Sequence, residues 1–282
     1  MTALERTNKQ RFRHEALSSK ISGIEKIFSD SNIKINTSHS LLGLLNDARD
    51  LAVEWSNEKF DQTNINKLFS ALHVERIYSG IDLLEREKNK EKYLRDLLNG
   101  TLNFFERDAS HAKNILWELE AFTKIKKVLP NTYLEEPDIV VNLDRFSIAV
   151  PCKKIYSEKG VSKVLSNAVS QIENDHEFGI VAMNIDDLIP VSVLLKASTF
   201  QEAADKLHAQ NMAFLKRHER HFLKYLTTSR IVAVIASTSM VTDIVDESPK
   251  FNNFSQWAIW TIPGLKAEHK KAIDGFRQKV IG

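Results

Sequence analysis

The sequence predicts an α/β protein, with a mostly helical N-terminal half followed by a central mixed β-sheet flanked by helices. Two observations carry this prediction. Apolar residues recur at helical spacing through much of residues 5–100, whereas short β-type runs alternate with amphipathic stretches from about residue 108 onward. Strands that alternate with helices are typical of a sheet covered by helices. We therefore expect a helical region over residues 1–105 and a sheet-containing domain over residues 106–282.

The amino-acid composition indicates a general class of protein but does not indicate a function. The chain has 282 residues, of which 43% are hydrophobic and 27% charged, so a folded globular protein is expected and wholesale disorder is excluded. The formal net charge is only +2, whereas nucleic-acid-binding proteins often carry a strong basic excess. Any binding of nucleic acid would therefore have to depend on a local basic patch.

Three features favour a cytoplasmic protein without a membrane segment. Cys152 is the only cysteine, so no intramolecular disulfide can form, and this fits a reducing compartment. The first residues are polar and lack the apolar stretch of a secretory signal. The longest apolar run, at residues 231–236, is too short to cross a bilayer and fits a buried strand better.

Four amphipathic helices are expected in the N-terminal region, separated by polar breaks. Their apolar stripes begin at Leu17, Leu41, Ile65 and Leu83. Residues 30–40 are rich in turn formers and are expected to form a loop, and Asn64 is expected to cap the third helix. The fourth helix is expected to run from Leu83 to Phe105, weakened at Asn99-Gly100.

The remainder of the chain predicts an alternation of helices and strands. A hairpin is expected where two β-type runs flank Asp144-Arg145. The expected helices cover residues 108–128, 157–172, 200–226 and 266–281. The expected strands cover residues 138–143, 146–150, 179–185, 230–237 and 258–262.

Glu118, Asp138 and Lys153 form the most suggestive set of polar residues. Glu118 lies on the helix before the hairpin, Asp138 begins the first hairpin strand, and Lys153 ends the second. Because the start of one hairpin strand faces the end of the next, Asp138 and Lys153 can be neighbours. Phosphodiester hydrolysis needs a divalent cation held by oxygen ligands, together with a positive group near the reacting water. The order of these residues along the chain suits such a site.

Residues 108–240 resemble the PD-(D/E)xK nuclease superfamily, including its restriction-endonuclease-like members. The resemblance depends on Pro137-Asp138, on Lys153 in the VPCKKI segment, and on Gln171 in the following helix. It implies a restriction-endonuclease-like core over residues 106–282 and a nuclease that acts on DNA. It also implies roles for Glu118, Asp138, Lys153 and Gln171 in catalysis, with Glu118 and Asp138 binding Mg²⁺ or Mn²⁺.

The resemblance further implies a biological setting and a role for the N-terminal region. Bacterial proteins of this kind often act in restriction or antiphage defence. Many of them dimerise to cut both strands. The helical residues 1–105 would then bind a partner protein, a regulator or a second copy of the chain.

Pro151 departs from the family pattern, because the family places its second metal-binding acid two residues before the lysine. Three interpretations remain open. Glu118, Glu120 or Glu136 could replace the missing acid, or the metal could be held more weakly by Glu118, Asp138 and a backbone carbonyl. Alternatively, the protein is a catalytically inactive nuclease fold that binds nucleic acid or a protein partner. A small-molecule enzyme is a further class, but no motif in the sequence favours it.

Simpler structural roles also fit the same residues. Glu118 could be an exposed helix acid paired with Lys124, and Asp138 could merely follow a proline turn. Glu120 lies about 200° around the helix from Glu118 and is the weaker candidate. Cys152 fits a small buried apolar residue better than a nucleophile.

One long helix carries the best local basic patch. Two histidines, His218 and His221, lie on this helix without the acids or cysteines of a metal site. A basic surface is therefore the preferred interpretation, and it could contact phosphates. Its members are Lys216, Arg217, Arg220 and Lys224.

Overall fold

A computed structural model describes residues 5–10, 16–57, 64–143, 146–190, 193–247 and 251–280, with only the backbone described for residues 5–10. Its strands are β1 (Glu5–Gln10), β2 (Thr132–Tyr133), β3 (Ile139–Leu143), β4 (Phe146–Val150), β5 (Cys152–Lys154), β6 (Phe178–Asn184), β7 (Leu195–Ala197), β8 (Ile231–Ile244) and β9 (Phe251–Trp260). They form one nine-stranded sheet in the order β1-β9-β8-β6-β4-β3-β2, with β5 paired to β6 and β7 paired to β8. The sheet is mixed, because β6 is parallel to β4, β5 and β8 while β3–β4 and β8–β9 are antiparallel.

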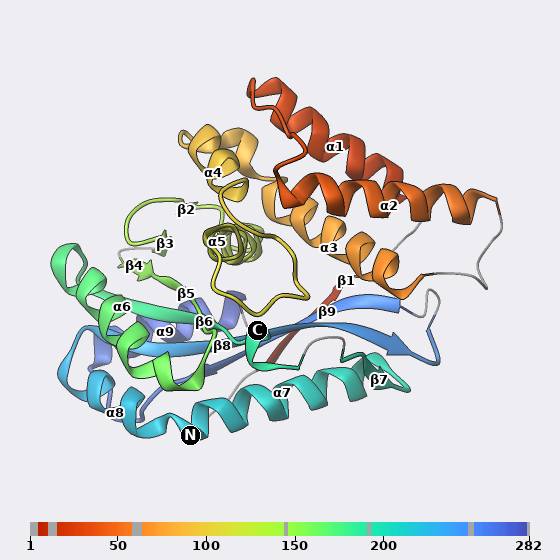
Figure 1. Ribbon diagram of the computed structural model, residues 1–282. Helices are drawn as coiled ribbons and strands as arrows, with labels where there is room; N and C mark the ends of the chain where they lie inside the picture. Colours follow the sequence, from red (N-terminus) through yellow and green to blue (C-terminus); the bar gives the residue numbers. More distant parts are fainter. Residues whose placement is uncertain are drawn as a thin grey trace.

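Helices cover both faces of this sheet (Figure 1). The helices are α1 (Leu17–Asp30), α2 (Ser40–Ser56), α3 (Ile65–Ile81), α4 (Lys90–Leu97), α5 (His111–Lys126), α6 (Val161–Asp175), α7 (Phe200–Arg217), α8 (Glu219–Thr228) and α9 (Ala267–Val280). Short 3₁₀ turns occur at η3 (Leu84–Arg86), η4 (Glu158–Gly160) and η5 (Asp186–Leu188). Helices α1 to α5 lie on one side of the sheet, and α6, α7 and α8 lie on the other. The α/β class and the helix-flanked mixed sheet are confirmed.

The central strand β6 shows why the sheet lies at the middle of the molecule. All seven of its residues are buried. Ile180 and Ala182 pack into the cluster that contains the side chains of α5, while Val181 and Met183 pack into the cluster that contains those of α6 and α8. A strand whose alternate side chains are buried on both faces is expected to be apolar, and the FGIVAMN segment is apolar up to Asn184 at its end.

The N-terminal helices follow the predicted apolar stripes. Helix α1 buries Leu17, Ile21 and Ile24, and α3 begins where the side chain of Asn64 accepts a hydrogen bond from the backbone N–H of Asn66. The predicted cap is therefore confirmed. The buried apolar side chains of α1 to α5 belong to the same cluster as some of those of β3, β6 and β8. The boundary at residues 105/106 stays a prediction, because these contacts do not show whether either part folds alone.

Several predicted elements differ in the structure, each for a physical reason. Residues 5–10 form β1 instead of a helix, since their backbone pairs with β9 at the sheet edge. The helix expected from Leu83 to Phe105 is reduced to η3 and α4, and the chain turns at Gly100, whose φ of 115° is strained for residues with a side chain. The helix expected over residues 200–226 breaks at His218, which ends α7 and precedes α8.

The expected strands also change in length. β8 and β9 extend well beyond the predicted strands, because each pairs with the other along most of its length. The edge strands β2 and β7 were not predicted and are very short. Pro151 separates β4 from β5, since proline has no N–H to donate to a ladder. The linker Asp144-Arg145 lies outside the described residues. Within the described residues, no helix has both the length and the apolar character to span a bilayer.

Candidate functional site

Three separate elements bring the predicted site residues to one end of the β3–β4 hairpin. Glu118 lies on α5, Asp138 directly precedes β3, and Lys153 is the middle residue of β5. In the hairpin register Ile139 pairs with Val150, so Asp138 lies beside the point where the chain leaves β4 through Pro151. Asp138 and Lys153 are therefore neighbours, as the hairpin geometry predicts.

The Asp138 carboxylate is held by two donors from the opposite strand. Lys153 Nζ lies 2.9 Å from Asp138 Oδ2, and the Cys152 backbone N–H donates to the same oxygen with an N···O distance of 2.5 Å. The carbonyl oxygen of Pro151 accepts a hydrogen bond from the Ala182 N–H at 2.9 Å, which ties this segment to β6. Asp138 is therefore fixed by the sheet and is more than a residue of a proline turn.

Glu118 is buried in the same neighbourhood, with only 8% of its surface exposed. Burial raises the pKa of Glu118 to about 8, and the negative charge of Asp138 acts in the same direction. The Tyr93 hydroxyl, which has a hydrogen-bonding interaction with Glu118, and the positive charge of Lys153 oppose this rise in pKa. Burial also raises the pKa of Asp138, against the opposing effects of Lys153 and the Cys152 N–H. The site therefore holds two carboxyl groups that repel one another when both are charged.

Burial rules out the interpretation of Glu118 as an exposed partner of Lys124. Lys124 is itself buried, and its Nζ lies 4.4 Å from the centre of the Trp257 ring. Tyr93, from α4, was not predicted as part of the site. The sequence does not indicate this residue, because Tyr93 reaches the site only through the packing of α4 against α5.

Gln171 occupies a less defined position. It lies on α6, and its buried Oε1 has no hydrogen-bond partner among the described residues. The end of α6 is joined to the segment before Asp138, because His176 Nε2 donates to the carbonyl oxygen of Glu136 at 2.9 Å. No hydrogen bond joins the Gln171 Oε1 to the other three residues, so its role stays a prediction.

This site could supply a hard divalent cation with only a few oxygen ligands from the protein. Among the described residues, no group of three or more His, Cys, Asp or Glu side chains is arranged to hold a metal ion. Mg²⁺ is commonly bound by one or two carboxylates, with water and substrate oxygens completing its shell. Glu118 and Asp138 fit that donor set. Glu136 is exposed, and its charge raises the pKa of Asp138, so it is near enough to act as a further acid.

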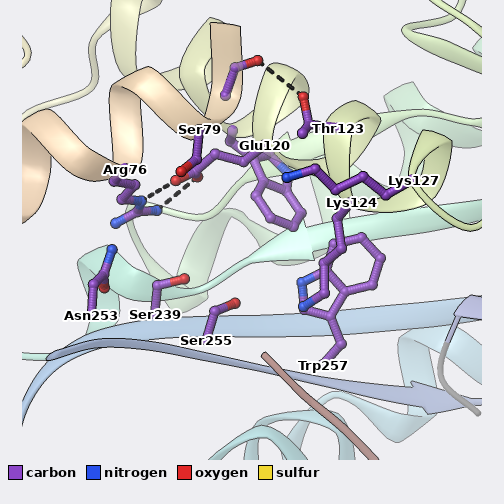
Figure 2. Close-up of a pocket in the computed structure, with 12 residues that line it drawn as sticks. Arg76, Ser79, Glu120, Thr123, Lys124, Lys127, Ser239, Asn253, Ser255 and Trp257 are labelled. Carbon is purple, nitrogen blue, oxygen red and sulfur yellow. Dashed lines mark hydrogen bonds and ion pairs between the residues drawn. The ribbon is translucent and has the colours of Figure 1, made fainter. Parts of the chain in front are cut away.

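Glu120 belongs to a different cluster and does not replace the missing acid. Both of its carboxylate oxygens accept hydrogen bonds from Arg76 of α3, as Figure 2 shows, and Arg76 Nη2 also lies 2.6 Å from Asp186 Oδ2. The opposite helix face predicted for Glu120 is consistent with this arrangement.

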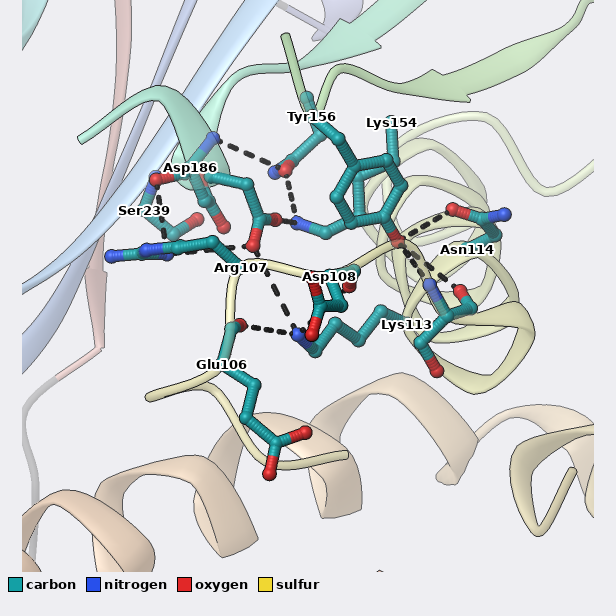
Figure 3. A network of polar contacts seen from close by, with 12 residues as sticks. Glu106, Arg107, Asp108, Lys113, Asn114, Lys154, Tyr156, Asp186 and Ser239 are labelled. Atoms are coloured by element: carbon teal, nitrogen blue, oxygen red, sulfur yellow. Dashed lines mark hydrogen bonds and ion pairs between the residues drawn. The ribbon is translucent and has the colours of Figure 1, made fainter. Parts of the chain in front are cut away.

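A second polar cluster lies where the parallel strands β5 and β6 end, and sequence reasoning missed it. We call it the ion network, and its members are Arg76, Arg107, Lys113, Glu120, Lys154, Asp186 and Asp187. Lys154 Nζ, which is almost fully buried, lies 2.5 Å from Asp187 Oδ2 and 2.7 Å from Asn184 Oδ1 (Figure 3). The two acids that follow the buried strand β6 could have indicated this cluster. Ligand sites often lie at the carboxyl ends of parallel strands.

The predicted basic patch is partly neutralised. Arg217 Nη2 lies 2.6 Å from Glu158 Oε1, whereas Lys216, Arg220 and Lys224 are exposed. Its proposed contact with phosphates stays a prediction. Cys152 is buried, and burial raises the pKa of its thiol well above the usual value, as expected for a structural residue.

No protein-family model matches the sequence, and neither the curated proteins nor the solved structures contain a significant match to it.

Proposed function

We propose that the protein is a divalent-metal-dependent deoxyribonuclease that hydrolyses phosphodiester bonds, with Glu118, Asp138 and Lys153 at its active site. The observation that carries this proposal is their convergence from α5, the start of β3 and β5. The order α5, β2, β3, β4, α6, β6 and the pairing of those strands support a restriction-endonuclease-like core. A cytoplasmic role in restriction or antiphage defence is part of the same proposal.

Each residue has a distinct role in this proposal. Bound Mg²⁺ or Mn²⁺ would polarise the scissile phosphate and lower the pKa of the attacking water. Glu118 and Asp138 would hold the cation through their carboxylate oxygens. Lys153 would then orient the water or stabilise the charge that develops on the phosphate. Gln171 would support the site or contact the DNA backbone.

Nicking of supercoiled plasmid DNA tests the proposal. Purified protein should nick the plasmid with Mg²⁺ or Mn²⁺, and Asp138→Asn or Lys153→Ala should abolish nicking. Asp175→Asn and Lys163→Ala change the same residue types at exposed positions of α6, and both variants should retain activity. Nicking that survives the changes at Asp138 and Lys153 would exclude this site as its source.

A catalytically inactive nuclease fold that binds nucleic acid or a protein partner is the second candidate. One observation favours it: Asp138 Oδ2 already accepts from both Lys153 and the Cys152 N–H, and Pro151 supplies no acid beside them. A relic of this kind should take up no Mn²⁺ in calorimetry, and Asp138→Asn should leave its binding of DNA unchanged.

Pro151→Glu separates the two candidates more sharply. The change restores an acid two residues before Lys153, so it should create or increase nicking if the rest of the pocket is competent. Circular dichroism and the unfolding midpoint would show whether the variant folds. A folded Pro151→Glu protein with no gain in nicking would favour the inactive fold.

A further inference from the structure

A small pocket lies beside the ion network, where α3, the loop before α5, η5 and β8 meet. It has a volume of about 60 Å³. Its wall combines aromatic rings with basic side chains. Its lining includes Phe104, Phe105, His73, Arg76, Arg107 and Asp186.

The charges of the ion network do not cancel. Four basic side chains face three carboxylates, which leaves one positive charge in excess. Arg76 and Lys154 are each bound closely by carboxylates, and Lys113 Nζ lies 2.6 Å from the Glu106 carbonyl oxygen. A carbonyl oxygen carries no net charge, so the excess charge is shared by Lys113 and Arg107, which lie 4.0 Å and 3.5 Å from the same oxygen, Asp187 Oδ1.

Arg107 is weakly held and faces the pocket. Its Nη1 contacts the Asp186 carbonyl oxygen at 3.4 Å and Asp187 Oδ1 at 3.5 Å, both at the limit of a hydrogen bond. Its buried Nε has no partner among the described residues. Figure 3 shows the side chain reaching from its loop toward Asp186 and Ser239. A guanidinium with unused donors suits a planar or tetrahedral anion.

Asp186 carries a negative charge, which the neighbouring cations Arg76 and Lys154 offset. Oδ2 accepts from Arg76 at 2.6 Å, and Oδ1 accepts from the Ser239 N–H at 2.7 Å. The neighbouring positive charges of Arg76 and Lys154 outweigh the effect of burial and lower its pKa.

His73 supplies a second unused donor. It is 8% exposed, its ring stacks on Phe104 with centroids 3.9 Å apart, and its buried Nδ1 has no hydrogen-bond partner in the described parts of the chain. Burial lowers the pKa of His73 well below its usual value, and the positive charge of Arg76 acts in the same direction. The ring is therefore neutral, and one tautomer can donate a hydrogen bond from Nδ1.

We propose that this pocket binds a phosphate group, with Arg107 and His73 as its donors and the Phe104 and Phe105 rings as its apolar wall. A water molecule needs about 10–15 Å³ of cavity volume, so the pocket has room for roughly four to six waters. That space accepts a phosphate group and excludes a whole nucleotide. The group could be free phosphate or the terminal phosphate of a nucleic acid. The proposal does not depend on nuclease activity.

Thermal unfolding with inorganic phosphate is the first test. Phosphate should raise the melting temperature of the wild-type protein in a saturable way, because a ligand that binds only the folded state stabilises it. Arg107→Gln and His73→Phe should each weaken the response by roughly tenfold to hundredfold, as expected for the loss of a hydrogen bond to a charged group. Arg95→Gln is the matched control, since Arg95 is exposed and pairs locally with Glu91.

The second test identifies the source of the phosphate. A 5′-phosphorylated oligonucleotide should bind more tightly than the same oligonucleotide with a 5′-hydroxyl if the pocket receives a nucleic-acid end. Equal binding of the two, together with a response to inorganic phosphate that requires Arg107, would assign the pocket to free phosphate.

Melting temperatures without phosphate show whether the variants fold, and Asp138→Asn should respond to phosphate as the wild type does. That outcome would hold even if no nicking is ever observed, so failure of one proposal is distinguishable from failure of the other. The phosphate site is overturned if wild type and Arg107→Gln respond alike to both probes, or if neither protein responds.

Discussion

Arg76→Ala should be among the most destabilising single changes in this protein. Arg76 is 7% exposed and donates to both oxygens of Glu120 and to Asp186. Its positive charge is favoured by these two carboxylates, which raise its pKa against the opposing effect of burial. Removing the guanidinium leaves the half-buried Glu120 and the buried Asp186 side by side without their common partner.

The size of the effect follows from this geometry. Breaking a buried ion pair by removing one partner costs about 3–5 kcal/mol, because an uncompensated charge remains. Here two carboxylates lose the same partner, while Lys154 still lowers the pKa of Asp186 and limits the loss there. We therefore expect Arg76→Ala to reduce the free energy of unfolding by about 3–5 kcal/mol. That is a large part of the stability of an ordinary folded domain, about 5–15 kcal/mol.

Urea unfolding followed by circular dichroism measures this loss. Arg95→Ala is the control, because Arg95 and Glu91 form an exposed pair and its removal should cost at most about 0.5 kcal/mol. A double-mutant cycle with Glu120→Ala should give an interaction energy of about 1–3 kcal/mol. A loss for Arg76→Ala no larger than that for Arg95→Ala would refute the assignment of the ion network as a buried structural element.

Three further predictions test other parts of the structure. Gly179→Ala should destabilise the protein by about 1–3 kcal/mol, because its methyl group would lie 2.6 Å from the Ala149 carbonyl oxygen, whereas Gly43→Ala meets no atom within 4 Å and should stabilise α2 by about 0.5–1 kcal/mol in urea unfolding. Because burial lowers the pKa of His73 in the folded state, the unfolded chain binds the extra proton first and wild-type stability should fall as the pH drops below about 6.5. His73→Phe should flatten that pH dependence, and an unchanged slope between neutral and acidic pH would count against a buried neutral ring. Cys152 should react with a thiol reagent only in denaturant, since burial raises its pKa; rapid labelling of the native protein would show that it is accessible.

Local sequence patterns predicted much of the fold. The apolar stripe of α1, the Asn64 cap and the β3–β4 hairpin depend on residues close together in the chain, and the structure confirms all three. β1 could not be predicted in this way, because ERTNKQ has no apolar alternation and is a strand only through pairing with β9. The break at His218 also comes with a contact that is distant in sequence, since His218 Nε2 lies 3.3 Å from Glu158 Oε2.

Some residues of the polar sites could likewise be placed together from the sequence, and others could not. Asp138 and Lys153 could be placed together because a hairpin fixes which positions face each other. The ion network could not, because Arg76 and Asp186 are 110 positions apart and meet only when α3 packs above the sheet. Tyr93 escaped notice for a similar reason, since nothing in the sequence of α4 points toward Glu118.

The two adjacent lysines of β5 have a consequence for how this segment can change. Successive side chains of a strand leave opposite faces, and here Lys153 contacts Asp138 while Lys154 contacts Asp187. A deletion or insertion of one residue between β4 and β5 would exchange the two faces, so both contacts would be lost at once. We therefore expect the Pro151 position to tolerate substitutions far better than changes in length.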